Sequence, residues 1–152
     1  MGRLKVLTDG ASRGNPGHSG IGIVVYDEND FILRTYKEYI GEATNNQAEY
    51  RAILKSLDII KKLRTNIEVD FNSIDFYSDS ELMVNQINFE YMSKDPELAV
   101  LNNKFHVLIK KLNIPYTVSH IDRSKNKNAD KLANLAIDRK VKEGKSIISG
   151  KE

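Results

Sequence analysis

The sequence contains no cysteine and no tryptophan among its 152 residues. Without cysteine the chain cannot form a disulfide, a thiolate zinc site or an iron–sulfur cluster, and it has no cysteine nucleophile. The absence of disulfides is compatible with the reducing cytoplasm, where we expect the protein to be located. A chain of this length buries roughly 68–70% of the surface that its unfolded form exposes, so the fold needs no metal for stability. We therefore expect any bound metal ion to serve chemistry.

The sequence also lacks a long hydrophobic run and a large excess of charge of one sign. No apolar stretch approaches the roughly 20 residues of a membrane-spanning helix, and glycine and aspartate interrupt the first ten residues. We therefore expect no signal peptide and no membrane partner. Lysine and arginine number 23 and aspartate and glutamate 21, which gives a net charge of +2. This balance by itself predicts no nucleic acid or other charged partner.

The hydrophobic pattern predicts alternating strands and helices. β-rich runs predict strands at residues 4–8, 20–26, 31–40, 74–79 and 116–121. Apolar residues at helical spacing predict helices at residues 45–63, 97–112 and 127–142, and a short helix from Ser80. The stretch rich in Gly, Ser and Asn between the first two strands predicts a tight loop. Without a repeat or a low-complexity linker, residues 1–142 are expected to form a single domain, and residues 143–152 a polar, frayed C-terminal tail.

The order of these elements predicts an α/β fold. The first three strands follow one another closely, which is typical of an antiparallel meander, and helices connect the later strands. We therefore expect a mixed sheet with helices packed against it. In such sheets, functional sites gather where strands end and helices begin.

Four carboxylates occupy unusual positions in these elements. Glu49 lies on the apolar face of the first predicted helix, one turn before Ile53, and Asp130 lies at the edge of the apolar face of the last helix. Asp9 and Asp79 end the first and fourth predicted strands, and we expect the chain to turn directly after each. Each acid has an ordinary alternative interpretation as a first-turn helix acid, a turn residue or a helix cap.

The four acids could nevertheless meet at one end of the sheet. Carboxylates gathered in one place raise one another's pKa values unless cations neutralise them. Oxygen ligands select hard cations such as Mg²⁺ or Mn²⁺. Two such ions about 3.5–4 Å apart drive in-line displacement at a phosphodiester. A convergence of these acids would therefore indicate phosphodiester chemistry.

Four sequence blocks resemble, in order and spacing, the motif blocks of type 1 ribonuclease H. They are TDGASRGNPG, TNNQAEYRAI, FYSDSELMVNQI and HIDRSKNKNADKLANLA, and they cover nearly the whole chain. The resemblance implies a ribonuclease H-like fold, with a five-stranded mixed sheet flanked by helices. It also implies an endoribonuclease that hydrolyses the RNA strand of RNA–DNA hybrids and leaves 5′-phosphate and 3′-hydroxyl ends.

The resemblance also assigns roles to individual residues. Asp9 would bridge two Mg²⁺ or Mn²⁺ ions. Asp130 would help to hold the ion that activates the attacking water, whereas Glu49 and Asp79 would hold the ion at the leaving 3′ oxygen. His120 matches a histidine that acts in catalysis or product release in many members, although it could simply end the last strand. Six further residues match positions that contact the hybrid in the family: Ser12, Gly14, Asn15, Thr44, Asn45 and Asn46.

The chain departs from some members of the family in its nucleic-acid contacts. It has no long basic, tryptophan-bearing protrusion between the third and fourth acids, and only eight residues precede Asp9. We therefore expect the protein to bind the hybrid more weakly, and with more sensitivity to salt, than those relatives do. We also expect a monomer. Five cations are candidates for added phosphate contacts, or else are solvated surface charges: Lys94, Arg123, Lys125, Lys127 and Lys131.

Other functions stay open at this point. One is cleavage of double-stranded RNA or of junctions, in addition to hybrids or in their place, and another is the ribonuclease module of a reverse transcriptase system. A third is a non-catalytic domain that binds hybrids. The retention of all four acids argues against a non-catalytic binding domain. A surface that only binds nucleic acid gains nothing from negative charges clustered beside the phosphates. A structural domain whose acids are all caps is the least favoured interpretation.

Overall fold

The protein is described by a computed structural model that covers residues 2–66, 69–89 and 93–150, with the backbone alone for 145–150. Its elements are, in order, β1 (Gly2–Gly14), β2 (Gly17–Tyr26), β3 (Ile32–Ala43), α1 (Asn45–Leu63), β4 (Phe71–Ser78), α2 (Glu81–Ile87), α3 (Pro96–Leu112), β5 (Tyr116–His120), the 3₁₀ turn η1 (Arg123–Lys125) and α4 (Lys127–Gly150). In this part of the chain, no helix is both long enough and apolar enough to cross a membrane. The predicted alternation of strands and helices is confirmed.

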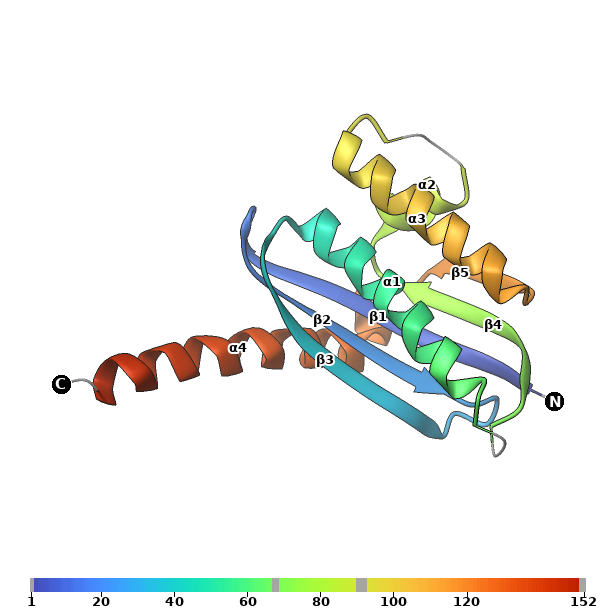
Figure 1. The fold of residues 1–152 in the computed structure, drawn as a ribbon, viewed down its shortest axis with the longest axis horizontal. Helices are drawn as coiled ribbons and strands as arrows, with labels where there is room; N and C mark the ends of the chain where they lie inside the picture. Colours follow the sequence, from blue (N-terminus) through green and yellow to red (C-terminus); the bar gives the residue numbers. More distant parts are fainter. Residues whose placement is uncertain (1, 67–68, 90–92, 151–152) are drawn as a thin grey trace.

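The strands form one five-stranded mixed sheet in the order β3-β2-β1-β4-β5. β1, β2 and β3 pair antiparallel, whereas β4 pairs parallel with both β1 and β5. The helices α1, α2 and α3 lie on one face of the sheet, and α4 crosses the other face and continues away from it (Figure 1). The predicted fold, a mixed sheet flanked by helices with an initial antiparallel meander, is confirmed.

The main hydrophobic core lies between the sheet and the helices α1 to α3. Val6 of β1 and Phe76 of β4 are buried there against Ile53 of α1 and Phe105 of α3. Burial of each such side chain contributes about 1.5–3 kcal/mol relative to exposure. This packing fixes α1 over the central strands and so fixes the position of its N-terminal turns.

The N-terminus of α1 is set by local hydrogen bonds. Thr44 Oγ1 accepts from the backbone N–H of Gln47 at 3.1 Å, and Gln47 Oε1 accepts from the N–H of Thr44 at 2.9 Å. This reciprocal capping box satisfies two donors that the first helical turn would leave unpaired. The predicted helix bounds, residues 45–63, are confirmed.

The tight loop predicted between the first two strands is wrong for most of its length. β1 continues to Gly14 and β2 begins at Gly17, so that only Asn15 and Pro16 separate the strands. The antiparallel ladder runs without interruption up to the pair Gly14 and Gly17. Glycine lowers strand propensity, but its small size is what the packing on both faces of these strands requires.

The close packing is clearest at Gly10 and Gly22. A Cβ atom on Gly10 would lie 2.2 Å from the backbone carbonyl carbon of Ala48 in α1. A Cβ atom on Gly22 would lie 2.1 Å from the carbonyl oxygen of Ala129 in α4. The two glycines therefore let α1 and α4 approach the same region of the sheet from opposite faces.

The last helix is longer than the sequence predicts. α4 continues to Gly150, so the frayed tail expected from residue 143 is wrong for the backbone up to that point. The segment has no proline, and the single internal glycine, Gly144, costs a helix only about 1 kcal/mol relative to alanine. Nothing local therefore stops the helix at residue 142. Residues 151–152 lie outside the described part of the chain.

Candidate active site

Asp9 and Asp79 lie side by side because β1 extends past the end of β4. The parallel ladder between these strands ends at the pair Thr8 and Ser78, and Asp79 follows directly. The prediction that both acids end strands is therefore wrong for Asp9. It lies inside β1 and pairs with Gly22 of β2. The carboxyl end of a parallel strand such as β4 is a common place for a site in α/β sheets.

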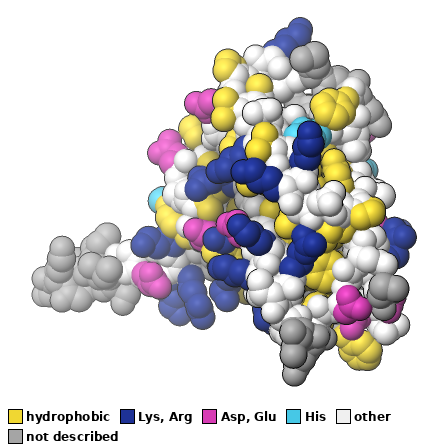
Figure 2. Space-filling model, turned by 45° about the vertical axis from the view of Figure 1, so that its right-hand side comes forward, with side chains coloured by type: hydrophobic (Ala, Val, Ile, Leu, Met, Phe, Trp, Pro, Cys, Tyr) yellow, Lys and Arg dark blue, Asp and Glu magenta, His cyan; other side chains and the backbone are white. Residues whose placement is uncertain are grey.

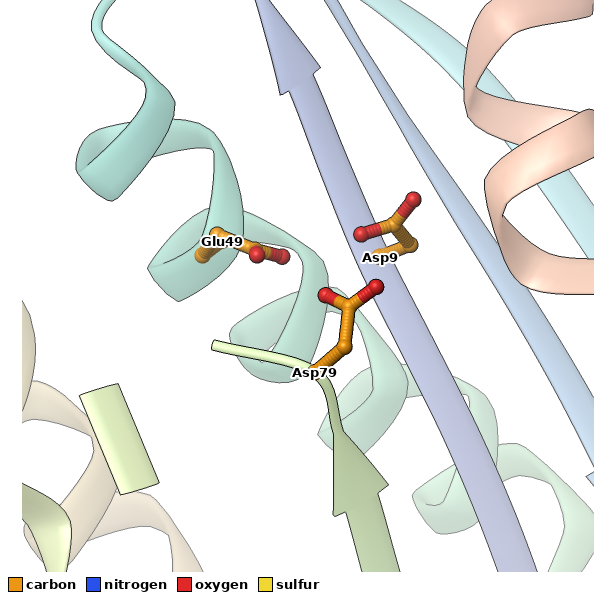
Figure 3. Close-up of side chains that lie close together, drawn as sticks. All are labelled: Asp9, Glu49 and Asp79. Atoms are coloured by element: carbon orange, nitrogen blue, oxygen red, sulfur yellow. The ribbon is translucent and has the colours of Figure 1, made fainter. Parts of the chain in front are cut away.

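Glu49 reaches the same place from α1. Figure 3 shows its side chain directed toward Asp9 and Asp79, which come from β1 and from the end of β4. Glu49 Oε1 accepts from the backbone N–H of Gly10 at 2.7 Å. This bond is possible because Gly10 lets the α1 backbone approach β1 so closely. This hydrogen bond therefore fixes the Glu49 carboxylate and the start of α1 relative to β1.

The three carboxylates form a buried cluster. Asp9, Glu49 and Asp79 each offer an oxygen atom, and these oxygens all lie within 4.8 Å of one another. Asp9 is 4% exposed and Glu49 is 8% exposed. The Nε atom of Arg123 lies 3.8 Å from Asp79 Oδ2, but the Arg123 side chain is 88% exposed. Solvent screens that ion pair strongly, so it offsets little of the negative charge.

The cluster perturbs the acidity of its members. Burial raises the pKa of Asp9 to about 10, and the charges of Glu49, Asp79 and Asp130 act in the same direction. Burial raises the pKa of Glu49 to about 8, although the hydrogen bond from Gly10 opposes the rise. Without a cation, the two carboxyl groups therefore hold protons more tightly than isolated carboxyl groups do. A divalent cation would favour their ionised forms.

The donor set fits a hard divalent cation. The three clustered side chains offer only carboxylate oxygens, which suit Mg²⁺ and Mn²⁺ rather than softer metals. Burial and mutual repulsion raise the pKa values of Asp9 and Glu49, and a bound cation would counter that repulsion. The arrangement is therefore suited to holding metal ions rather than to supporting the fold.

Asp130 lies at the same site but outside the tight cluster. It is half-buried in the first turn of α4, and its charge is close enough to raise the pKa of Asp9. Its Oδ1 atom accepts from Asn134 Nδ2 at 3.1 Å. All four predicted acids line one cavity of about 420 Å³, together with Ser12, Asn45, Asn46, Arg123 and Asn134 among others. The convergence of the four acids at one end of the sheet is thus found in the structure.

The six residues matched to hybrid contacts divide into two groups. Ser12, Asn45 and Asn46 line the cavity, whereas Gly14, Asn15 and Thr44 do not. The groups are nevertheless connected. The Ser12 N–H donates to Asn45 Oδ1 at 3.1 Å, and the Asn45 N–H donates to Asn15 Oδ1 at 3.0 Å. These bonds tie the end of the β1–β2 hairpin to the start of α1, which Thr44 caps.

The structure does not bring His120 to the carboxylates. His120 ends β5, where it pairs with Ser78, and its side chain is exposed. It is not among the residues that line the cavity. Its role in catalysis or product release stays a prediction.

Five residues that line the cavity are not among the predicted site residues: Gly10, Ala11, Ser80, Arg123 and Asn134. The sequence analysis names Arg123 only as a candidate phosphate contact and assigns no role to Asn134. The sequence does carry a signal for Asn134, because it follows Asp130 by four residues and so shares its helix face. Arg123 lies in a polar stretch without periodicity, where the sequence alone does not show which cation reaches the acids.

Four carboxylates converge on one cavity at the end of a parallel strand in a five-stranded mixed sheet, and this arrangement is typical of proteins with a ribonuclease H-like fold. The family model described as "Reverse transcriptase-like" matches residues 7–136. The chain is 34% identical over 137 residues to Ribonuclease HI of Halobacterium salinarum, covering 90% of this chain and 65% of that relative. It is 30% identical over 156 residues to Ribonuclease H of Clostridium botulinum, covering 91% and 97%.

Solved structures agree with these sequence matches. The structure of LC11-RNase H1 in complex with an RNA/DNA hybrid superposes with a TM-score of 0.82 at 36% identity, over 91% of this chain and 99% of that one. The chain spans about two thirds of the halobacterial relative and nearly all of the clostridial one. It belongs to the type 1 ribonuclease H family.

Proposed function

We propose that the chain is an endoribonuclease that hydrolyses the RNA strand of RNA–DNA hybrids with two Mg²⁺ or Mn²⁺ ions, leaving 5′-phosphate and 3′-hydroxyl ends. The observation that carries the proposal is the cluster of Asp9, Glu49 and Asp79, whose oxygens lie within 4.8 Å of one another. The substrate class is supported by the similarity to LC11-RNase H1, which has been solved with an RNA/DNA hybrid.

Four carboxylates would hold the two ions. Asp9, Glu49 and Asp79 already form a compact oxygen donor set, and Asp130 faces the same cavity from α4. When bound, two divalent ions supply Lewis-acid stabilisation to the attacking and the leaving oxygens of an in-line displacement. The chain itself contributes the fixed orientation of the ligands, because Gly10 holds Glu49 and the β1–β4 register holds Asp9 next to Asp79. All four carboxylates come from one chain, and we propose a monomer as the active unit.

Neutral polar groups would contact the duplex. Ser12, Asn45 and Asn46 present a hydroxyl and two amides at the cavity. Such groups suit the shallow groove of an A-like duplex, where 2′-hydroxyls and sugar edges are recognised more than base edges. Arg123 is exposed at the cavity and can donate two hydrogen bonds to a phosphate. Recognition of this kind does not need a strongly basic chain.

Charge on the surface supports binding of a polyanion. On the face shown in Figure 2, lysine and arginine side chains outnumber acidic ones, and they gather near the middle of the face and where α4 leaves the body. Because phosphate contacts release counterions, binding that depends on such side chains weakens as salt rises. Such side chains would add a salt-sensitive contribution to the binding of a hybrid by a chain of net charge +2.

The test is cleavage of labelled RNA–DNA hybrid, double-stranded RNA and double-stranded DNA by the purified protein in Mg²⁺, Mn²⁺ or EDTA. We expect cleavage of the RNA strand of the hybrid with either metal and none in EDTA, and no cleavage by the Asp9→Asn variant. Hybrid binding without cleavage in any divalent ion would identify a non-catalytic binding domain and overturn the proposal. Faster cleavage of double-stranded RNA than of hybrid would overturn the substrate assignment.

A further inference from the structure

Arg13 of β1 ties the end of the β1–β2 hairpin to α4. Its Nη2 atom donates to the backbone oxygen and to the Oδ1 atom of Asn134, both at 3.3 Å. Its Nη1 atom forms an ion pair with Asp138. Asp130, Asn134 and Asp138 are spaced one helical turn apart, so they share the face of α4 that meets the hairpin. One arginine thus engages two successive turns of this face.

These contacts determine which way the Asn134 amide points. Arginine has only donors and an ionised carboxylate has only acceptors, so the amide between them satisfies both in one orientation alone. Its oxygen must face Arg13 and its nitrogen must face Asp130. Asn134 Nδ2 indeed donates to Asp130 Oδ1 at 3.1 Å and to the Asp130 backbone oxygen at 3.0 Å.

Asp130 is less enclosed by the fold than Asp9 and Glu49 are. Glu49 is held by the Gly10 N–H and by burial, and Asp9 is fixed within a sheet. Asp130 is half-buried, in the first turn of a helix, and outside the tight cluster. Its carboxylate is therefore oriented by Asn134, together with the side-chain hydrogen bond that it shares with Asp9. Groups that orient a metal ligand in this way typically contribute 10–100-fold to metal affinity or activity.

We propose that Asn134 is a positioning residue for Asp130, and that Arg13 sets the orientation of Asn134. The inference rests on the proposed function, because Asp130 acts there as a metal ligand. Arg13 lies between Ser12 and Gly14, two of the residues matched to hybrid contacts. The chain of contacts therefore links the hairpin that would hold the duplex to the carboxylate that would hold the metal.

The first experiment titrates Mn²⁺ alone into the protein by calorimetry. In Asn134→Leu, which keeps the branching at Cγ but removes both hydrogen bonds, we expect the Kd for Mn²⁺ to rise about tenfold. The kcat for hybrid cleavage falls by a similar factor while KM stays within about twofold, because the residues matched to hybrid contacts are unchanged. Asn134→Gln keeps an amide donor, and we expect it to retain part of the Mn²⁺ affinity and part of the kcat that Asn134→Leu loses. An unchanged Kd for Mn²⁺ in Asn134→Leu would overturn the proposal.

A matched control lies on the same helix. Asn128 is exposed, does not line the cavity, and donates to the Tyr26 hydroxyl at 3.0 Å. Asn128→Leu makes the same chemical change away from the acids and should bind Mn²⁺ as the wild type does. Thermal unfolding in EDTA checks that Asn134→Leu is folded. A rise in Kd of equal size in both variants would overturn the proposal, because it would show a general effect on α4.

A double-mutant cycle tests the role of Arg13. We expect Arg13→Met to raise the Kd for Mn²⁺ about threefold in the wild type and to have no further effect in Asn134→Leu, because Arg13 acts through Asn134. Equal effects in both backgrounds would contradict this. The titration needs no substrate, so its outcome is independent of the hybrid assay. Wild-type protein that binds Mn²⁺ but fails to cleave hybrid would refute the proposed function, while the Mn²⁺ titrations alone would decide the role of Asn134.

Discussion

Asp9 of β1 lies directly opposite Gly22 of β2, and the α4 backbone packs on Gly22. A Cβ atom at this position would lie 2.1 Å from the carbonyl oxygen of Ala129. Asp130 is the next residue along α4. The missing side chain of Gly22 therefore sets how close the helix comes to the sheet at the level of Asp9, and so brings the fourth acid to the site.

Gly22→Ala should destabilise the protein because the methyl group meets backbone rather than a flexible side chain. We expect the free energy of unfolding to fall by about 3 kcal/mol, measured by chemical denaturation. Gly144→Ala is the matched control, since nothing lies within 4 Å of a Cβ atom there. It should stabilise the protein by up to about 1 kcal/mol through helix propensity. Similar changes in the two variants would contradict the close packing of α4 on β2.

Asp9→Asn should abolish cleavage, whereas His120→Ala should only reduce it. Asp9 lies in the buried cluster, and we expect a loss in kcat of at least about 1,000-fold. His120 is exposed and outside the cavity, and we expect a loss of about 10- to 100-fold if it assists proton transfer or product release. Steady-state hybrid cleavage measures both. Equal losses in the two variants would refute this division of roles, and His18→Ala is the control for loss of an exposed histidine.

The metal-free protein should lose stability as pH rises. Burial raises the pKa of Asp9 to about 10 and that of Glu49 to about 8, both above their values in an unfolded chain. The folded state therefore binds more protons than the unfolded state between pH about 4 and pH about 10. The resulting stability is fully present below pH about 4, and its loss is complete once pH has risen through about 8 for Glu49 and about 10 for Asp9. The decline is at most about 1.4 kcal/mol per pH unit for each carboxyl group.

Thermal unfolding in EDTA from pH 5 to pH 9 would show this decline. Asp9→Asn should flatten it, because the amide cannot ionise, and should be more stable than the wild type at pH 8. Saturating Mn²⁺ should also remove much of the decline by favouring the ionised carboxylates. A wild type whose metal-free stability rises between pH 6 and pH 9 would show that the carboxyl groups are not protonated in the folded state.

Asn45→Ala should weaken binding of the hybrid more than it slows chemistry. Asn45 lines the cavity and joins Ser12 to the start of α1, but it does not belong to the carboxylate cluster. We expect KM for the hybrid to rise about tenfold, the equivalent of one or two hydrogen bonds, while kcat stays within about twofold. Asn103→Ala, on the exposed face of α3, is the control. A fall in kcat without a rise in KM would contradict a binding role.

Much of the fold could be predicted because its signals are local. The capping box of Thr44 and Gln47 and the apolar spacing that follows predict the bounds of α1 correctly. The predicted bounds of β1 and β2 are too short, because the intrinsic propensities of glycine and serine favour a loop. These residues form strands since two helices need close access to them. The length of α4 was missed for a simpler reason, because a polar composition does not distinguish a solvated helix from a frayed tail.

The sequence by itself determined the order of strands and helices, the four acids, and the positions of Glu49, Asp79 and Asp130 near the ends of their elements. These features depend on neighbours within a few residues. Only the tertiary structure decided that Asp9 lies within a strand, that three carboxylates are buried together while Asp130 stands apart, and that Arg13 reaches Asn134 across 121 residues. Those relationships arise from the packing of α1 and α4 on opposite faces of one sheet, and no local pattern encodes how closely two such surfaces meet.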